Sequence, residues 1–189
     1  DRIAVEVLAN VAAMEAAVEL GSSTDTITLD DLLGIHRTLM ERSSTPGIAG
    51  SIRTVQNWIG GSSYNPCSAA FVPPPPDALG ELLDDLLAYV NGDDHPALVQ
   101  AAIAHAQFET IHPFVDGNGR TGRALAQAML RSKGLVEHVT VPISAGLLAI
   151  SGTSLVFVQV VQSALDALVA VAVGHLGARA AASPRGRWA

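Results

Sequence analysis

Residues 112–123 bring together the side chains in this sequence that are best suited to chemistry. A histidine exchanges a proton near neutral pH, a carboxylate is a preferred Mg²⁺ ligand, and an arginine binds phosphate through paired N–H groups. All three kinds of side chain occur in this short stretch, at His112, Asp116, Arg120 and Arg123. The combination indicates a site where a phosphate-bearing ligand is held beside a proton-transfer group.

The same stretch predicts a backbone structure that would hold such a ligand. Gly117 and Gly119 allow the chain to turn its N–H groups outward, and the apolar run over residues 124–130 predicts a helix that begins near Gly119. The positive end of a helix dipole favours an anion, and Arg120 and Arg123 lie three residues apart on that helix. The alternative is a plain helix entry with surface arginines, which requires neither a histidine nor charges of both signs.

The order of these residues resembles the signature of the Fic family, His-Pro-Phe-x-(Asp/Glu)-Gly-Asn-Gly-Arg-x-x-Arg, and matches it at every specified position. The flanking residues 101–110 and the upstream Trp58-Ile59-Gly60-Gly61 are also similar to the family. The similarity extends from the first predicted helix to about Leu148. The resemblance implies a mainly α-helical Fic-type bundle with a small β-hairpin flap beside the active site.

The resemblance also implies the activity of a protein adenylyltransferase, which moves AMP from ATP to a Ser, Thr or Tyr hydroxyl of a target protein or of itself. His112 is then the catalytic base and Asp116 the Mg²⁺ ligand. The side-chain amide of Asn118 is expected to donate to a phosphate oxygen, and Arg123 takes the terminal phosphate. The residues expected to bind ATP are Gly117, Asn118, Gly119, Arg120 and Arg123.

Two other functions remain open at this point. Fic relatives also transfer UMP, phosphocholine or phosphate, although the intact Gly117-Asn118-Gly119 favours AMP transfer over the kinase branch. The second alternative is a non-catalytic module that binds a nucleotide. His112 argues against the module, because binding alone does not require a base.

The partners expected from the resemblance are a target protein and a source of inhibition. The family flap pairs with a target peptide by strand addition, and here a β-hairpin or flap-like loop is expected over residues 53–72, from Arg53 to Val72. A plain surface hairpin is the alternative.

Many relatives carry an inhibitory helix, Ser/Thr-x-x-x-Glu-(Gly/Asn), whose Glu pairs with the second arginine. No glutamate of this sequence has Ser or Thr four positions earlier. A preceding segment or a separate antitoxin is therefore expected to supply a Glu to Arg123.

Composition narrows the class of protein. Hydrophobic residues make up 49% and charged residues 15% of the 189 residues, which indicates one globular domain, expected over residues 1–180 with a flexible tail at 181–189. The net charge of −7 argues against nucleic acid and anionic membranes as partners. The apolar run over residues 155–176 is interrupted by polar side chains, so it predicts a buried helix and no membrane span. A single cysteine, Cys67, fits a reducing, cytoplasmic location.

Helical spacing of apolar residues predicts the elements that must position the signature. The expected helices cover about residues 2–20, 28–41, 77–91 and 96–110, then the signature helix up to a cap at Lys133-Gly134, and finally 144–150 and 155–176. Gly21 is expected to end the first helix and Thr28 to cap the second. His36 is interpreted as a partly buried or surface histidine. His105 and Glu109 are four residues apart, and a hydrogen-bonded structural pair is favoured over a metal pair.

Overall fold

Five α-helices and three short 3₁₀ helices carry the described part of this computed structural model, residues 2–62 and 64–138. The helices are α1 (Arg2–Ser23), α2 (Leu29–Met40), α3 (Leu79–Asn91), α4 (Ala97–Ile111) and α5 (Asn118–Ser132). The 3₁₀ helices are Pro46–Ile48, Pro66–Ser68 and Pro76–Ala78. The prediction of a mainly α-helical fold is confirmed.

The chain divides into two compact units, Asp1–Val139 and Thr140–Ala189. Every described residue belongs to the first unit. The helices predicted over 144–150 and 155–176, and the tail at 181–189, lie outside the described residues. A single domain that extends to residue 180 therefore stays a prediction.

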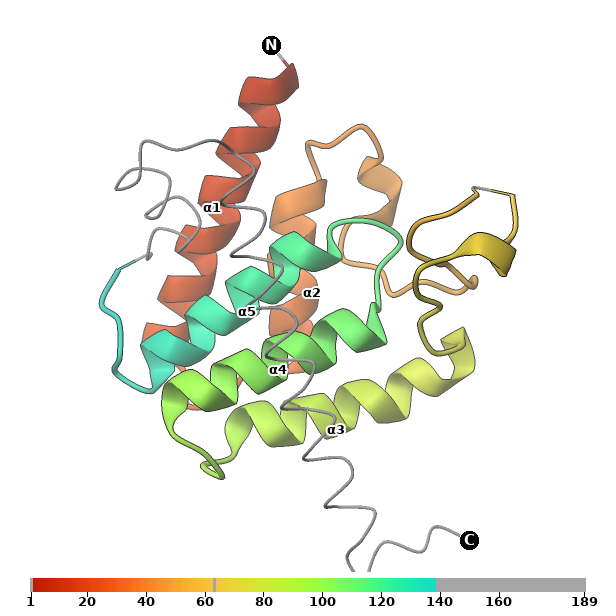
Figure 1. Cartoon of the computed structure of the whole chain (residues 1–189). Helices are drawn as coiled ribbons and strands as arrows, with labels where there is room; N and C mark the ends of the chain where they lie inside the picture. Colours follow the sequence, from red (N-terminus) through yellow and green to blue (C-terminus); the bar gives the residue numbers. More distant parts are fainter. Residues whose placement is uncertain (1, 63, 139–189) are drawn as a thin grey trace, which may run out of the picture. The chain divides into compact units, whose positions relative to one another are not determined.

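The helix α5 lies in the middle of the bundle (Figure 1). It packs against α1, α2 and α4, while α3 packs against α4. Apolar side chains from all five helices form the core, and Phe108, Phe114 and Leu125 are fully buried in it. Because α4 and α5 share this core, the loop that joins them is held at one edge of the bundle.

The helix α1 continues through Gly21, so the prediction that this glycine ends the helix is wrong. The reason is tertiary. A Cβ at Gly21 would overlap the backbone carbonyl of Ala128 in α5 and lie 2.9 Å from Cβ of Arg131. The absent side chain allows the backbones of α1 and α5 to approach closely, and Gly21 therefore serves helix packing.

The helix α2 begins as the sequence predicts, at the cap Thr28. The Thr28 hydroxyl accepts from the N–H of Asp31 at 3.3 Å, and the Asp31 carboxylate accepts from the N–H of Thr28 at 2.9 Å. This reciprocal capping box fixes where the helix starts. The face of α2 that turns toward the core includes His36.

The β-hairpin expected over residues 53–72 is not confirmed. The described residues of this flap segment, 53–62 and 64–72, contain one antiparallel bridge between Ile59 and Phe71 and no longer strand. Beyond the bridge the chain turns at once, because Gly60 and Gly61 have φ values of 75° and 70°. The flap segment is thus a loop closed by a single bridge.

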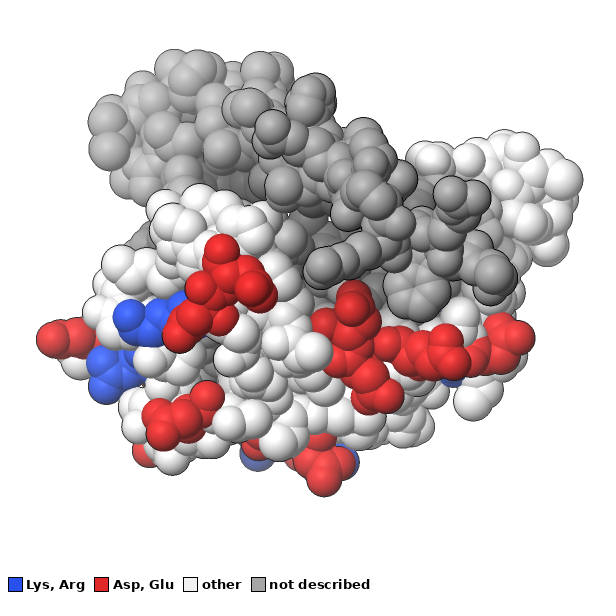
Figure 2. Space-filling view, turned by 90° about the horizontal axis from the view of Figure 1, so that it is seen from below, with Lys and Arg blue, Asp and Glu red and all other residues white. Residues whose placement is uncertain are grey.

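Among the charged side chains in the view of Figure 2, Asp and Glu are more prominent than Lys and Arg. This distribution agrees with the net charge of −7. None of the helices in residues 2–62 and 64–138 combines the length and apolar character needed to cross a bilayer.

Candidate functional site

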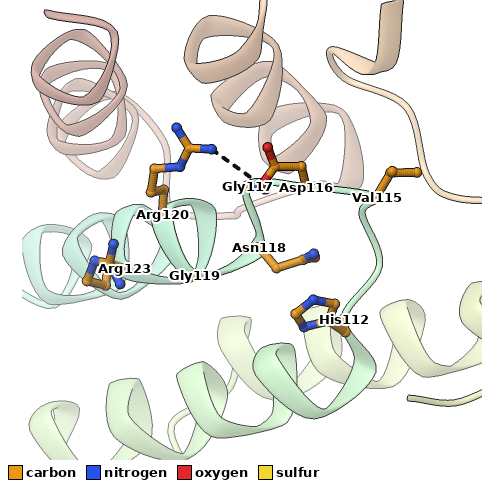
Figure 3. Close-up of a pocket in the computed structure, with 8 residues that line it drawn as sticks. All are labelled: His112, Val115, Asp116, Gly117, Asn118, Gly119, Arg120 and Arg123. Atoms are coloured by element: carbon orange, nitrogen blue, oxygen red, sulfur yellow. Dashed lines mark hydrogen bonds and ion pairs between the residues drawn. The ribbon is translucent and has the colours of Figure 1, made fainter. Parts of the chain in front are cut away.

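The loop between α4 and α5 forms one wall of a pocket of about 260 Å³ (Figure 3). All seven residues that the sequence analysis assigned to the site line this pocket, together with Val115. They are His112, Asp116, Gly117, Asn118, Gly119, Arg120 and Arg123. The fold therefore gathers the signature around a single cavity.

The floor of the pocket is the N-terminus of α5. Gly117 is the N-cap with φ 82°, a left-handed conformation that glycine adopts without strain. The helix begins at Asn118, one residue before the predicted start. The first helical hydrogen bond runs from the N–H of Thr121 to Gly117 O at 2.9 Å. The N–H groups of the first turn consequently have no partner within the helix, which makes this tip suited to an anion.

Gly119 has a different role from the one expected, because it is an ordinary helical residue of α5. A Cβ at this position would lie 3.5 Å from Nη1 of Arg123 and 3.9 Å from Oε1 of Glu109. The missing side chain leaves this space open in the pocket beside the arginine. Of the two signature glycines, Gly117 turns the backbone and Gly119 keeps the cavity clear.

The side chain of Asn118 braces the loop. It is 3% exposed; its Oδ1 accepts from the N–H of Phe114 at 2.8 Å, and its Nδ2 donates to the carbonyl of Phe114 at 2.8 Å. This geometry does not match the expected role of the amide as a phosphate donor. The backbone N–H of Asn118, in the first turn of α5, is the group that remains for an anion.

His112 ends α4 in a left-handed conformation, with φ 49° and ψ 60°. A non-glycine residue in this region is strained by about 1 kcal/mol or more, so its surroundings must hold it. Its N–H donates to the carbonyl of Phe108 at 2.9 Å, and its carbonyl accepts from Nε of the buried Arg53 at 2.9 Å. The turn directs the imidazole across the loop toward the tip of α5 (Figure 3).

Burial is the main reason why the pKa of His112 lies below its ordinary value of 6.5. The cation of Arg53 lowers the pKa further, while the carboxylate and carbonyl of Glu109 raise it. The neutral imidazole therefore prevails at pH 7. Its Nδ1 is buried without a hydrogen-bond partner among the described residues. A neutral imidazole beside a pocket has the properties of a general base.

Asp116 and Arg120 form an ion pair of 3.5 Å at the rim of the pocket (Figure 3). The paired oxygen of Asp116 also accepts from the N–H of Gly117 at 2.6 Å. The carboxylate is 62% exposed, so it is accessible to a cation. No group of three or more His, Cys, Asp or Glu in the described part of the chain is placed to hold a metal. A Mg²⁺ ion at Asp116 would therefore need phosphate and water oxygens, the ligands it prefers.

His36 belongs to the site, although the sequence analysis interpreted it as partly buried or exposed. It is fully buried on α2 beneath the loop. Its Nδ1 accepts from the N–H of Gly50 at 2.9 Å, so the proton lies on Nε2, which donates to the carbonyl of Asp116 at 3.0 Å. Its position among the apolar residues of α2, one residue after Ile35, was the signal in the sequence that His36 is buried.

His105 and Glu109 do not form the hydrogen-bonded pair that was expected. Nδ1 of His105 and Oε1 of Glu109 are buried without a partner in residues 2–62 and 64–138. Both atoms face Gly122 of α5, at 2.9 and 2.7 Å from where its Cβ would be. The side chains of His105 and Glu109 lie side by side along α4 and occupy the space that the missing side chain of Gly122 leaves.

Comparisons with known proteins identify the family to which this chain is similar. The sequence pattern of the Fic/DOC family matches residues 26–130. The chain is 34% identical over 118 residues to protein adenylyltransferase fic-1 of Caenorhabditis elegans, covering 61% of this chain and 21% of the relative. It is 36% identical over 119 residues to protein adenylyltransferase Fic of Culex quinquefasciatus, covering 61% and 22%.

Solved structures give the same family. A fragment of Fic-1 from C. elegans superposes with a TM-score of 0.56 at 28% identity, covering 89% of this chain and 50% of that one. A Fic family protein from Desulfovibrio desulfuricans gives 0.57 at 27% identity, covering 90% and 53%. The chain spans about a fifth of the curated relatives and about half of the solved chains. The matched pattern covers more than half of the chain and includes the whole pocket, and on this basis the chain belongs to the Fic/DOC family.

Proposed function

We propose that this protein transfers AMP from ATP to a Ser, Thr or Tyr hydroxyl of a target protein. The observation that carries the proposal is the neutral, half-buried imidazole of His112 in the same pocket as an arginine-flanked helix tip. The relatives named protein adenylyltransferase support the choice of AMP.

The phosphates of ATP would bind at the tip of α5. The first-turn N–H groups donate to phosphate oxygens, and Arg120 and Arg123 offset their charge. Mg²⁺ held by Asp116 and phosphate oxygens would supply further positive charge when bound. The pocket residues thus favour the extra negative charge that develops during phosphoryl chemistry.

His112 would remove the proton of the target hydroxyl as its oxygen attacks the α-phosphorus. The new O–P bond forms while the bond from the α-phosphorus to the bridging oxygen breaks, and pyrophosphate leaves. His112 then holds the proton and releases it to solvent. The lowered pKa suits this role because the imidazole is neutral before the reaction.

The target peptide would dock on the flap segment. Its single bridge between Ile59 and Phe71 leaves neighbouring backbone groups available for pairing with another strand. The side chains of Ile59, Phe71 and Val72 are 40%, 39% and 48% exposed, so they offer apolar contacts to the peptide.

Arg123 would be the point of inhibition. It is an exposed residue in the pocket, and a glutamate from a preceding segment or an antitoxin can reach it. We expect the AMP-transfer activity of this chain to be higher than that of a longer chain that carries such a glutamate. Equal or greater self-modification by the longer chain would count against this idea.

ATP labelled at the α- or the γ-phosphate tests the proposed function. Label that becomes covalently attached to protein from the α-phosphate indicates AMP transfer, and label from the γ-phosphate indicates a kinase. Nucleotide that binds without covalent labelling of protein indicates a binding module. His112→Ala is expected to lower α-label transfer by about 10²–10⁴-fold. Undiminished transfer by this variant would remove the base from the mechanism.

A further inference from the structure

Arg53 is a buried cation with no carboxylate partner in the described part of the chain. It is 2% exposed, and the ion pairs among residues 2–62 and 64–138 do not involve it. Backbone carbonyls accept its N–H groups instead, at Ile111 (3.5 Å), His112 (2.9 Å), Val55 (3.2 Å) and Pro74 (2.6 Å). A buried charge without a counter-ion is unfavourable unless it is hydrogen-bonded, so these carbonyls are what stabilise the guanidinium at this position.

Three of the carbonyls bonded by Arg53 are consecutive and surround the proposed base. Nη2 donates to Ile111 and Nε to His112, while the backbone N–H of Arg53 donates to Pro113 at 2.9 Å. The first two carbonyls end α4, where the helix dipole favours a cation. Arg53 therefore fixes the chain on both sides of the left-handed His112.

The other two carbonyls belong to the flap segment and its exit. Val55 lies two residues after Arg53, and Pro74 lies two residues after the end of the segment at Val72. A guanidinium is planar and presents its N–H groups at fixed angles. One rigid group thus joins the entry and exit of the flap to the residue that carries the imidazole.

We propose that Arg53 is a positioning residue, which holds His112 in its left-handed conformation and couples this base to the flap that binds the target. The inference rests on the proposed AMP transfer. Arg53 does not line the pocket. Its replacement is therefore expected to impair the chemical step more than ATP binding.

The charge of Arg53 adds a second, measurable effect. The charged and titratable groups near His112 are Glu109 on the same helix, Arg53 beneath it, and Asp116, Arg120 and Arg123 across the pocket. Among them, Arg53 lowers the pKa of His112 and Glu109 raises it. Removing the cation is expected to raise the pH at which His112 becomes neutral.

Two substitutions separate geometry from charge. Arg53→Lys keeps the charge but loses the planar fork, and Arg53→Gln loses the charge but keeps N–H donors. For α-label transfer we expect kcat to fall about 10- to 100-fold in both variants, as for a base that is misplaced by about 1 Å. The Kd of ATP is expected to change by less than about twofold. The acidic limb of the pH–rate profile should move to higher pH in Arg53→Gln only.

Lys133→Gln is the matched control, because this cation also bonds the end of a helix but lies outside the pocket. Its Nζ donates to the carbonyl of Gly92, the C-cap of α3, at 2.8 Å. We expect lower stability and unchanged kcat. A kcat of Arg53→Lys within about threefold of the parent, or losses of ATP affinity that match the losses of kcat, would overturn the proposal.

NMR measurements on His112 separate this proposal from the proposed function, because they require no turnover. The backbone chemical shifts of His112 should move away from left-handed values in Arg53→Lys, and its imidazole should titrate at higher pH in Arg53→Gln. Unchanged shifts overturn the positioning role even if AMP is transferred. Absence of transfer by the parent chain removes the proposed function but leaves this measurement valid. If Arg53→Gln does not fold, the chemical shifts and the kcat of Arg53→Lys decide.

Discussion

The ring of His36 lies flat against the ring of Phe114, with centroids 3.7 Å apart and planes within 2° of each other. The same imidazole links two loops, since it accepts from Gly50 and donates to the carbonyl of Asp116. A residue of α2 thereby supports the loop between α4 and α5 from below. The arrangement requires a neutral imidazole, because Nδ1 acts as an acceptor.

Replacement of His36 by Ala should loosen this loop. The substitution leaves a cavity beside Phe114 and removes the partners of Gly50 N–H and Asp116 O, so we expect the free energy of unfolding to fall by roughly 2–4 kcal/mol. ATP affinity should fall roughly fivefold because the loop must be ordered on binding. Chemical denaturation and calorimetric titration measure both. His95→Ala is the control, since His95 bonds Tyr89 outside the pocket, and equal effects of the two variants would argue against a supporting role.

Acid should destabilise the fold through His36 and His112. Burial is the main cause that lowers the pKa of each in the folded state. The unfolded chain therefore binds more protons below about pH 6.5, and stability declines as the pH falls from that value through the folded-state pKa values. Denaturation curves between pH 7 and pH 5 measure the decline, which His112→Ala should make shallower. An increase in stability as the pH falls from 7 to 5 would contradict the lowered pKa values of both histidines.

Replacement by alanine is expected to have opposite effects at two helical glycines, one at the contact between α1 and α5 and one away from it. Gly21→Ala forces a Cβ against the carbonyl of Ala128, and we expect a loss of about 1–3 kcal/mol from overpacking. Gly34→Ala, in α2, meets nothing within 4 Å and should stabilise the helix by roughly 0.5–1 kcal/mol. Thermal unfolding of both variants tests this pair. If Gly21→Ala stabilised the protein, the contact between α1 and α5 would not require a glycine at this position.

Asn118→Ala distinguishes a loop brace from a phosphate ligand. The variant loses both bonds to the backbone of Phe114 and should lose about 1–3 kcal/mol of stability. Asn57→Ala removes one bond to the same carbonyl and should have a smaller effect on stability. Denaturation and ATP binding are measured together. Unchanged stability with strongly reduced ATP affinity would instead support the side-chain amide as a phosphate donor.

The candidate site could be predicted from sequence because its groups are close along the chain. His112 and Arg123 fall within one loop and the first turns of one helix, so local geometry brings them to the same pocket. The backbone N–H groups at the tip of α5 follow from helix geometry alone. The start of α2 at Thr28 was predictable for the same reason, since a capping box is a local signal.

The partners of His36 and Arg53 could not be assigned from the sequence because they are distant along the chain. His36 reaches Asp116 across 80 positions, and Arg53 reaches His112 across 59. No periodicity or motif specifies such pairs. The flap was overestimated for a related reason: the resemblance implied a hairpin, but the described residues of the segment form only the bridge between Ile59 and Phe71.

The sequence by itself determined the family signature, the mainly helical class and the set of residues around the pocket, because all three depend on residue type and short spacing. Only the tertiary structure decided what holds these residues in place. Close packing against α5 requires a residue without a side chain at Gly21 inside α1. The buried guanidinium of Arg53 and the neutral imidazole of His36 hold the loop that carries His112 and Asp116. Such choices depend on burial and on partners far along the chain, which local spacing does not specify.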